Sequence, residues 1–177
     1  MSRDISFINL YLLSFPDGQI VMDKNKNVSV KEYIERVMQG SRFAVLATEG
    51  DGQPHASLIA ITPVEGFRQL IFATYRDTNK YRNLLLNSKV AVLIEIGDSG
   101  NPGHDNTFVL TVFGSAKEIN IAENEADLNA HLKRHPDLEM FLKSKDCALI
   151  RVTLVKFQLV HGIDDVRWWS VDDMDAT

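Results

Sequence analysis

Hydrophobic and polar positions along this chain alternate in short blocks that have the length of β-strands. Short apolar runs are separated by turn sequences such as Glu49-Gly50-Asp51-Gly52. Runs joined by short turns pair as antiparallel neighbours, so the first three runs predict a β-meander. Six strands are predicted in this way, over residues 43–48, 57–62, 69–74, 90–96, 108–117 and 147–160.

Apolar positions at helical spacing lie between some of these strands. A capping box at Ser29 and Glu32 begins a helix that Gly40 ends. Further helices are predicted from Asp77 or Thr78 onward, over residues 123–134 and over residues 137–143. Antiparallel strands with few helices indicate a mainly β fold with peripheral helices, arranged as a small barrel. No Gly-x-Gly-x-x-Gly follows a strand, which argues against a Rossmann domain.

The chain of 177 residues has the length of one domain. We assign residues 29–177 to this domain. Residues 1–28 are assigned to an N-terminal arm of undetermined structure, which ends in the polar segment 23–27. The composition, 45% hydrophobic and 24% charged, is that of a folded globular protein.

Charge and composition also restrict the partners. The net charge of −5 weighs against nucleic acid as a partner. The sequence has no apolar run of about 18 residues and no signal-peptide pattern, so it predicts a soluble, cytoplasmic protein without a membrane partner. The single cysteine, Cys147, excludes an internal disulfide framework and a multi-thiolate metal site. We expect its thiol to be a buried, small hydrophobic group.

Basic and hydroxyl side chains lie where the third predicted strand ends and a helix begins. Arg76, Thr78 and Lys80 alternate with other residues over this segment. The unpaired N–H groups and the positive dipole end of a helix start favour an anion. Guanidinium, hydroxyl and ammonium groups can all donate to a phosphate. The segment therefore indicates a phosphate site, with a solvated helix face capped by Thr78 as the alternative.

Other candidate residues have a structural interpretation beside the functional one. His55, just before the second predicted strand, is the candidate for a catalytic role, and a half-exposed strand position is the alternative. His131 and His135 share one helix face, but no third ligand is near in the sequence, so we predict no metal site. Trp168 and Trp169 either cover a barrel edge or reach a bound ligand.

Taken in order, four stretches of the sequence resemble the pyridoxamine 5′-phosphate oxidase-like family of FMN-binding split barrels. They are Leu46-Ala47-Thr48, Gly52-Gln53-Pro54-His55-Ala56-Ser57, FATYRDTNKYRNL over residues 72–84, and Asn87-Ser88-Lys89-Val90-Ala91-Val92. The resemblance covers roughly residues 30–160. It implies a six-stranded antiparallel Greek-key split β-barrel. It also implies a homodimer with two FMN molecules, each bound at the dimer interface.

The resemblance also assigns cofactor-binding residues. The second strand would lie along the flavin ring, and the third strand with its turn would hold the ribityl chain and the phosphate. Residues of the C-terminal tail would reach the flavin or the substrate. These positions are, in the same order, Ser57, Leu58, Ile59, Ala60, Ile61 and Thr62; Ala73, Thr74, Arg76, Thr78, Asn79 and Lys80; and Arg167 and Trp168.

The chain departs from the true pyridoxamine-phosphate oxidases at their substrate site. Those enzymes carry Arg where Ser57 stands and Lys where Thr62 stands, and their C-terminal Arg-x-His is absent here. The resemblance therefore implies an FMN-dependent oxidoreductase that moves hydride or electrons between a reduced donor and an unknown small organic substrate. A non-catalytic flavin or haem binding module and a deazaflavin-dependent reductase on the same fold are the alternatives.

Overall fold

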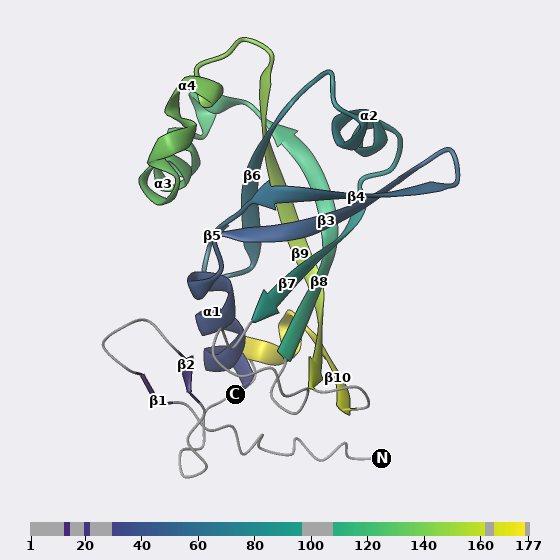
Figure 1. Ribbon diagram of the computed structural model, residues 1–177, viewed down its shortest axis with the longest axis vertical. Coiled ribbons are helices and arrows are strands. Elements are labelled where there is room, and N and C mark those ends of the chain that lie inside the picture. The colour runs from purple at the N-terminus through teal and green to yellow at the C-terminus, as the bar shows by residue number, and fades with distance from the viewer. Residues whose placement is uncertain (1–12, 15–19, 22–29, 97–107, 162–164, 176–177) are drawn as a thin grey trace.

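The computed structural model describes residues 13–14, 20–21, 30–96, 108–161 and 165–175 (Figure 1). Most of the predicted N-terminal arm over residues 1–28 lies outside the described residues. Within the arm, two short strands, β1 (Leu13–Ser14) and β2 (Ile20–Val21), pair antiparallel. Residues 97–107 also lie outside them.

The main body is an antiparallel β half-barrel of the split-barrel type, as the sequence predicts, with helices on its outside (Figure 1). Within the described part of the chain its sheet has eight strands, two more than predicted. The path runs β4-β3-β7-β8-β9-β6-β5, and β10 pairs with β9 beside this path. The strands are β3 (Phe43–Gly50), β4 (Gln53–Ala60), β5 (Thr62–Val64), β6 (Gln69–Tyr75), β7 (Lys89–Ile96), β8 (Phe108–Ile119), β9 (Cys147–His161) and β10 (Asp165–Ser170).

One of the two extra strands comes from a break at Ile61. The sequence predicts a single strand over residues 57–62, whereas the structure ends β4 at Ala60 and begins β5 at Thr62. β4 pairs with β3, and β5 pairs with β6. Continuous apolar residues fit one straight strand and a sharp corner equally well, so their pattern does not reveal this break.

The other extra strand, β10, forms a hairpin with the C-terminal half of β9. β9 is long enough to pair with β8 along most of its length, with β6 at its start and with β10 at its end. The sequence identifies the two tryptophans of β10 as apolar but assigns them to a tail. Trp169 packs against the core, and Trp168 is 47% exposed.

The helices lie at the positions that the sequence predicts, with small shifts of their ends. Thr78 is the residue that caps the second helix. The predicted helix over residues 137–143 is a 3₁₀ turn, η3, followed by one turn of α-helix, α4. The bounds are α1 (Val30–Gly40), α2 (Asn79–Leu86), η2 (Ile121–Glu123), α3 (Glu125–Arg134), η3 (Pro136–Leu138), α4 (Glu139–Leu142) and η4 (Asp172–Asp175).

Two clusters of buried apolar side chains hold these elements together. The larger lies between α1 and the inner face of the sheet, where Phe72 and Phe157 are the largest fully buried side chains. The smaller lies between β6, β9 and the helices α3 and α4, and includes Cys147, whose predicted burial is confirmed. Among the described residues, no helix is long and apolar enough to cross a membrane.

Candidate functional site

The turn from β6 into α2 has the structure of a helix start with open donors. The hydroxyl of Thr78 donates to the carbonyl oxygen of Tyr75 over 2.8 Å and accepts from the backbone N–H of Tyr81 over 3.4 Å. In the described part of the chain, the N–H groups of Asn79 and Lys80 have no hydrogen-bond partner. They therefore lie at the positive end of the helix dipole, where an anion is stabilised.

The side chain of Arg76 makes structural contacts within the fold and is not left open for a ligand. Its guanidinium donates to the carbonyl oxygens of Lys145 and Cys147, over 2.9 and 2.8 Å, and contacts the carboxylate of Glu118. Its backbone N–H also donates to the carbonyl oxygen of Asp146 over 2.9 Å. Arg76 thus fixes the turn before α2 to the start of β9, and most of its donors are taken.

Glu118 joins this arrangement from β8. The hydroxyl of Tyr81 donates to its carboxylate over 2.6 Å. Burial alone would raise the pKa of Glu118, but hydrogen bonds from Tyr81 and Arg76 outweigh burial and lower it. The charge of Arg76 is therefore balanced locally, so the guanidinium adds little net positive charge for an anion.

The net positive charge at the start of α2 comes from two other side chains. Lys80 is half-buried, and its side-chain ammonium makes no hydrogen bond or ion pair with any described residue. Arg82 donates to the carbonyl oxygen of Asp77 over 2.7 Å and contacts the side-chain oxygen of Asn79, which holds its guanidinium over the helix start. The sequence pattern does not single out Arg82, although its position four residues after Thr78 places it one helical turn away.

α2 is fixed to the β3–β4 hairpin by polar contacts. The side-chain amide of Asn83 donates to the hydroxyl of Thr48 over 3.1 Å, and Thr48 donates to the carbonyl oxygen of His55 over 3.4 Å. Asn87 donates to Glu49 over 2.8 Å. A Cβ at Gly50 would collide with the side chain of Asn83, which would have to shift to make room. The start of α2 and the strand β4 are therefore held in one arrangement.

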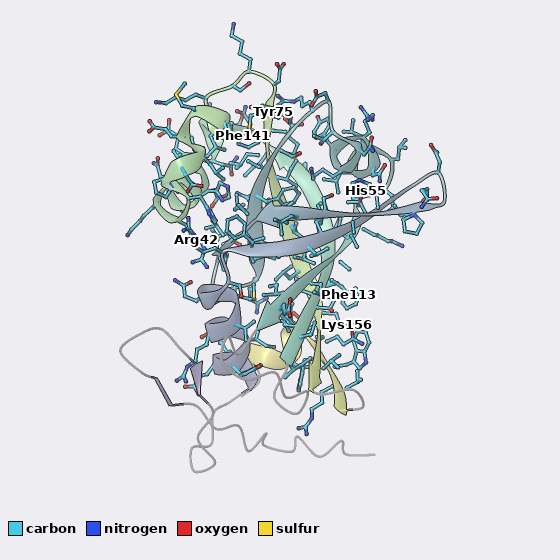
Figure 2. The ribbon with its side chains drawn as sticks, in the orientation of Figure 1. Arg42, His55, Tyr75, Phe113, Phe141 and Lys156 are labelled. Atoms are coloured by element: carbon cyan, nitrogen blue, oxygen red, sulfur yellow. The ribbon has the colours of Figure 1, made fainter. Side chains whose placement is uncertain are left out.

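β4 presents its residues to different surroundings. It ends the sheet path, so its outer backbone edge has no strand partner within the described residues. Leu58 is 70% exposed on the outer face, while Ile59 is buried. His55 and Ser57 are half-buried, with the Ser57 hydroxyl 3.3 Å from Nδ1 of His55. Figure 2 shows His55 on the half of β4 that lies toward α2.

The remaining residues that are predicted to contact the flavin ring or the phosphate are buried or half-buried. Ile61 and Thr62 are buried, and Thr62 bonds His131. Thr74 is buried, with its hydroxyl 3.0 Å from that of Thr78. Ala73 is half-buried against the smaller core cluster. These residues support the site from beneath and offer little side-chain surface to a ligand.

The two predicted tail residues lie on β10, which Figure 1 shows at the end of the molecule opposite α2. Arg167 is half-buried. Trp168 stacks on Phe113 with ring centroids 5.5 Å apart, and the Lys156 ammonium lies 4.1 Å from the Trp168 ring centroid. Figure 2 shows Phe113 and Lys156 side by side at this end. One chain therefore does not bring Trp168 to the start of α2.

The other candidates from the sequence, the histidine pair and Cys147, are buried. The rings of His131 and His135 lie 4.9 Å apart, and the described residues contain no group of three or more His, Cys, Asp or Glu that could hold a metal. Burial raises the pKa of Cys147 to about 11, so its thiol stays protonated and unreactive near neutral pH.

Comparison with known proteins links this architecture to one family. The family model for pyridoxamine 5′-phosphate oxidase matches residues 30–161. No curated protein matches the chain. The structure is similar to a haem-binding protein from Mycobacterium smegmatis, with a TM-score of 0.75 and 17% identity, over 85% of this chain and 62% of that protein. The chain thus spans less than two thirds of that protein.

Two further structures share the fold. One is a protein related to general stress protein 26 from Clostridium acetobutylicum, at a TM-score of 0.64 and 14% identity, over 81% of this chain and 96% of that one. The other is the haem storage protein HutZ from Vibrio cholerae, at a TM-score of 0.58 and 16% identity, over 76% of this chain and 91% of that one. At these identities the likeness concerns the fold alone.

Proposed function

This chain belongs to the pyridoxamine 5′-phosphate oxidase family, and we propose that it binds FMN and acts as an oxidoreductase on a small organic substrate. The observation that carries this proposal is the open, positively charged start of α2 beside the unpaired edge of β4. FMN carries a phosphate and a planar ring with polar edges, and these two features need complementary groups close together.

The start of α2 fits the phosphate. The unpartnered N–H groups of Asn79 and Lys80, the Lys80 ammonium and the guanidinium of Arg82 are donors that a phosphate needs. Arg76, although it is in the same turn, would act by holding the turn in place, because its donors already bond Lys145, Cys147 and Glu118.

The edge of β4 fits the ring. Its outer N–H and C=O groups could bond the polar edge of a flavin, and Leu58 and Ala60 are among the side chains of β4 that point to the outer face. When bound, FMN would supply the acceptance and donation of hydride or electrons. The protein would orient the ring, exclude water from one side and hold the phosphate.

His55 is the candidate for proton transfer. If the Ser57 hydroxyl donates to Nδ1, the neutral ring carries its proton on Nε2, where it could pass to a ligand. His55 lies on the strand proposed for the ring, and Thr48 connects its backbone to α2. A catalytic role for His55 requires the bound substrate to reach Nε2.

A homodimer is the second part of the proposal. The outer face of the sheet carries exposed apolar side chains on three adjacent strands, β4, β3 and β7, where Val45 lies opposite both Leu58 and Leu93. A contiguous apolar face of this kind is typical of an interface. Residues from β10 of one subunit, Arg167 and Trp168, would reach a flavin only on the partner, since they lie far from α2 of their own chain (Figure 1).

A non-catalytic module that binds flavin or haem is the alternative function. It is supported by the likeness to a haem-binding protein and to a haem storage protein. A deazaflavin on the same cradle is a third possibility, because its phosphate would use the same donors.

Visible absorption of the protein purified without added cofactor, with mass spectrometry of the released molecule, tests these functions against one another. We expect the two-band spectrum of an oxidised flavin, bleaching with a reduced nicotinamide donor, and release of FMN. A Soret band with released haem would replace the flavin proposal with the haem module. A flavin that no donor reduces and no acceptor reoxidises would support the non-catalytic module.

A further inference from the structure

The two ends of the sheet meet at a single residue. β4 and β5 are the outermost strands of the sheet path, and only Ile61 separates them in the sequence. The backbone N–H of Ile61 donates over 3.0 Å to the carbonyl oxygen of Arg42, just before β3. The chain therefore passes at Ile61 from one end of the sheet to the other. Contacts at this link hold the two ends of the half-barrel together.

Two buried histidines near the end of α3 contact Ile61 and the residue after it, Thr62. Nε2 of His135 donates to the carbonyl oxygen of Ile61 over 2.9 Å, because the carbonyl can only accept. Nδ1 of His131 lies 2.8 Å from the hydroxyl oxygen of Thr62. Both histidines are fully buried. One helical turn thus fixes the junction of β4 with β5.

The charges around the two histidines are mostly positive. Arg134 on α3 and Arg42 before β3 oppose a further positive charge, and Asp137 in η3 favours it. β5 and residues 69–74 of β6, which pack against α3, carry no ionisable side chain. Glu123 in η2 lies beside the opposite end of α3. A proton on His135 would therefore be buried close to both guanidinium groups, and a proton on His131 close to that of Arg134.

The remaining ring nitrogens have no acceptor ready for such a proton. Nε2 of His131 and Nδ1 of His135 are buried, and neither has a hydrogen-bond partner among the residues that the structure describes. Protonation of His135 would place an N–H at Nδ1 with nothing to accept it, which is costly in a buried site. Opening the link would let both rings reach water.

We propose that His131 and His135 form a proton-sensitive latch, which holds Ile61 and Thr62 while both rings are neutral and releases them in acid. Release would loosen the junction between β4 and β5 at Ile61. The effect on flavin binding at β4 rests on the proposed function, whereas the latch itself does not.

The direction of the pH dependence follows from the two protonation states. Burial, with smaller effects of His135 and Arg134, lowers the pKa of His131 to about 4. Burial also lowers the pKa of His135, although its bond to Ile61 opposes this. Histidine in an unfolded chain titrates near pH 6.5, so the open state binds the protons first. Stability from the latch is complete above about pH 6.5 and is lost as the pH falls toward about 4.

Thermal unfolding of the cofactor-free protein between about pH 7 and about pH 4 tests the latch in the variant His131→Asn/His135→Gln. Asn places an amide near the former Nδ1, and Gln places one near the former Nε2, so both bonds to the link can persist without titration. We expect the variant to lose markedly less Tm on acidification than the native protein. His55→Gln, which removes a histidine outside the latch, should keep the native slope. Equal slopes for the double variant and the native protein would overturn the proposal.

Should the double variant fail to fold, histidine ring resonances of the native protein give the second test. We expect the rings of His131 and His135 to stay neutral through pH 6 and to titrate only as the fold opens, when the amide of Ile61 loses protection from exchange. Titration of either ring near pH 6.5 in an intact fold would overturn the latch. Neither measurement uses FMN, so failure of the proposed function would leave both readouts unchanged.

Discussion

At the scale of single residues, the site depends on which cations remain available to a ligand. Arg76 and Lys80 both follow the end of β6, and the sequence treats them as equivalent phosphate ligands. The structure separates them, because Glu118 reaches Arg76 from β8. A local sequence pattern does not indicate a partner that is so distant along the chain. Thr78, by contrast, was predictable as a cap, since capping depends only on neighbours along the chain.

Removing Lys80 should weaken ligand binding without destabilising the fold. We expect Lys80→Ala to lower FMN affinity about tenfold, the loss of one charge-assisted bond to a phosphate, with Tm unchanged. Fluorescence titration with FMN measures this. Lys133→Ala, an exposed lysine on α3, is the matched control and should bind FMN normally. Native affinity in Lys80→Ala would remove Lys80 from the phosphate site.

Removing Arg76 should instead destabilise the fold. Arg76→Ala deletes two bonds to carbonyl oxygens and the contact with Glu118, so we expect a loss of about 1–2 kcal/mol in unfolding free energy by chemical denaturation. Arg76→Lys keeps the charge but not the planar fork and should recover only part of the loss. If Arg76→Ala unfolded at the native midpoint, a structural role for this side chain would be untenable.

At the scale of elements, the sequence predicts α1, α2, α3 and five of the six long strands close to their observed bounds, whereas the strand predicted over residues 57–62 begins at Gln53 and ends at Ala60. Their apolar periodicity and turn residues are local signals. The sequence does not predict the break at Ile61 or the strand β10, because both depend on which strands pair with one another in the folded sheet. The same holds for His131 and His135: their shared helix face is visible in the sequence, whereas their contacts with residues 61 and 62 require the folded sheet.

The docking of α2 on the hairpin gives a prediction at this scale. Gly50→Ala would push the Asn83 side chain off Thr48, so we expect a loss of about 1–2 kcal/mol in unfolding free energy and weaker FMN binding. Asn83→Ala removes both the collision and the bond. Adding Gly50→Ala to it should therefore cost little more, as a double-mutant cycle would show. Additive losses would mean that Gly50 is needed for another reason.

At the scale of the whole molecule, the proposed dimer explains why an apolar sheet face is exposed in one chain. We expect Leu58→Asp to give a monomer by light scattering, because a charge would be buried at the centre of the interface. Met140→Asp changes an equally exposed apolar residue on α4 and should leave the oligomer intact. A native protein that is already monomeric at micromolar concentration would contradict the dimer.

The proposed function rests on the claim that the start of α2 holds a phosphate, and parallel titrations of the cofactor-free protein with FMN and with riboflavin test it most directly. The two ligands share the ring and the ribityl chain and differ in the phosphate alone. With Lys80, Arg82 and two backbone N–H groups as donors, we predict that FMN binds about a hundredfold more tightly. Equal affinities would contradict the claim.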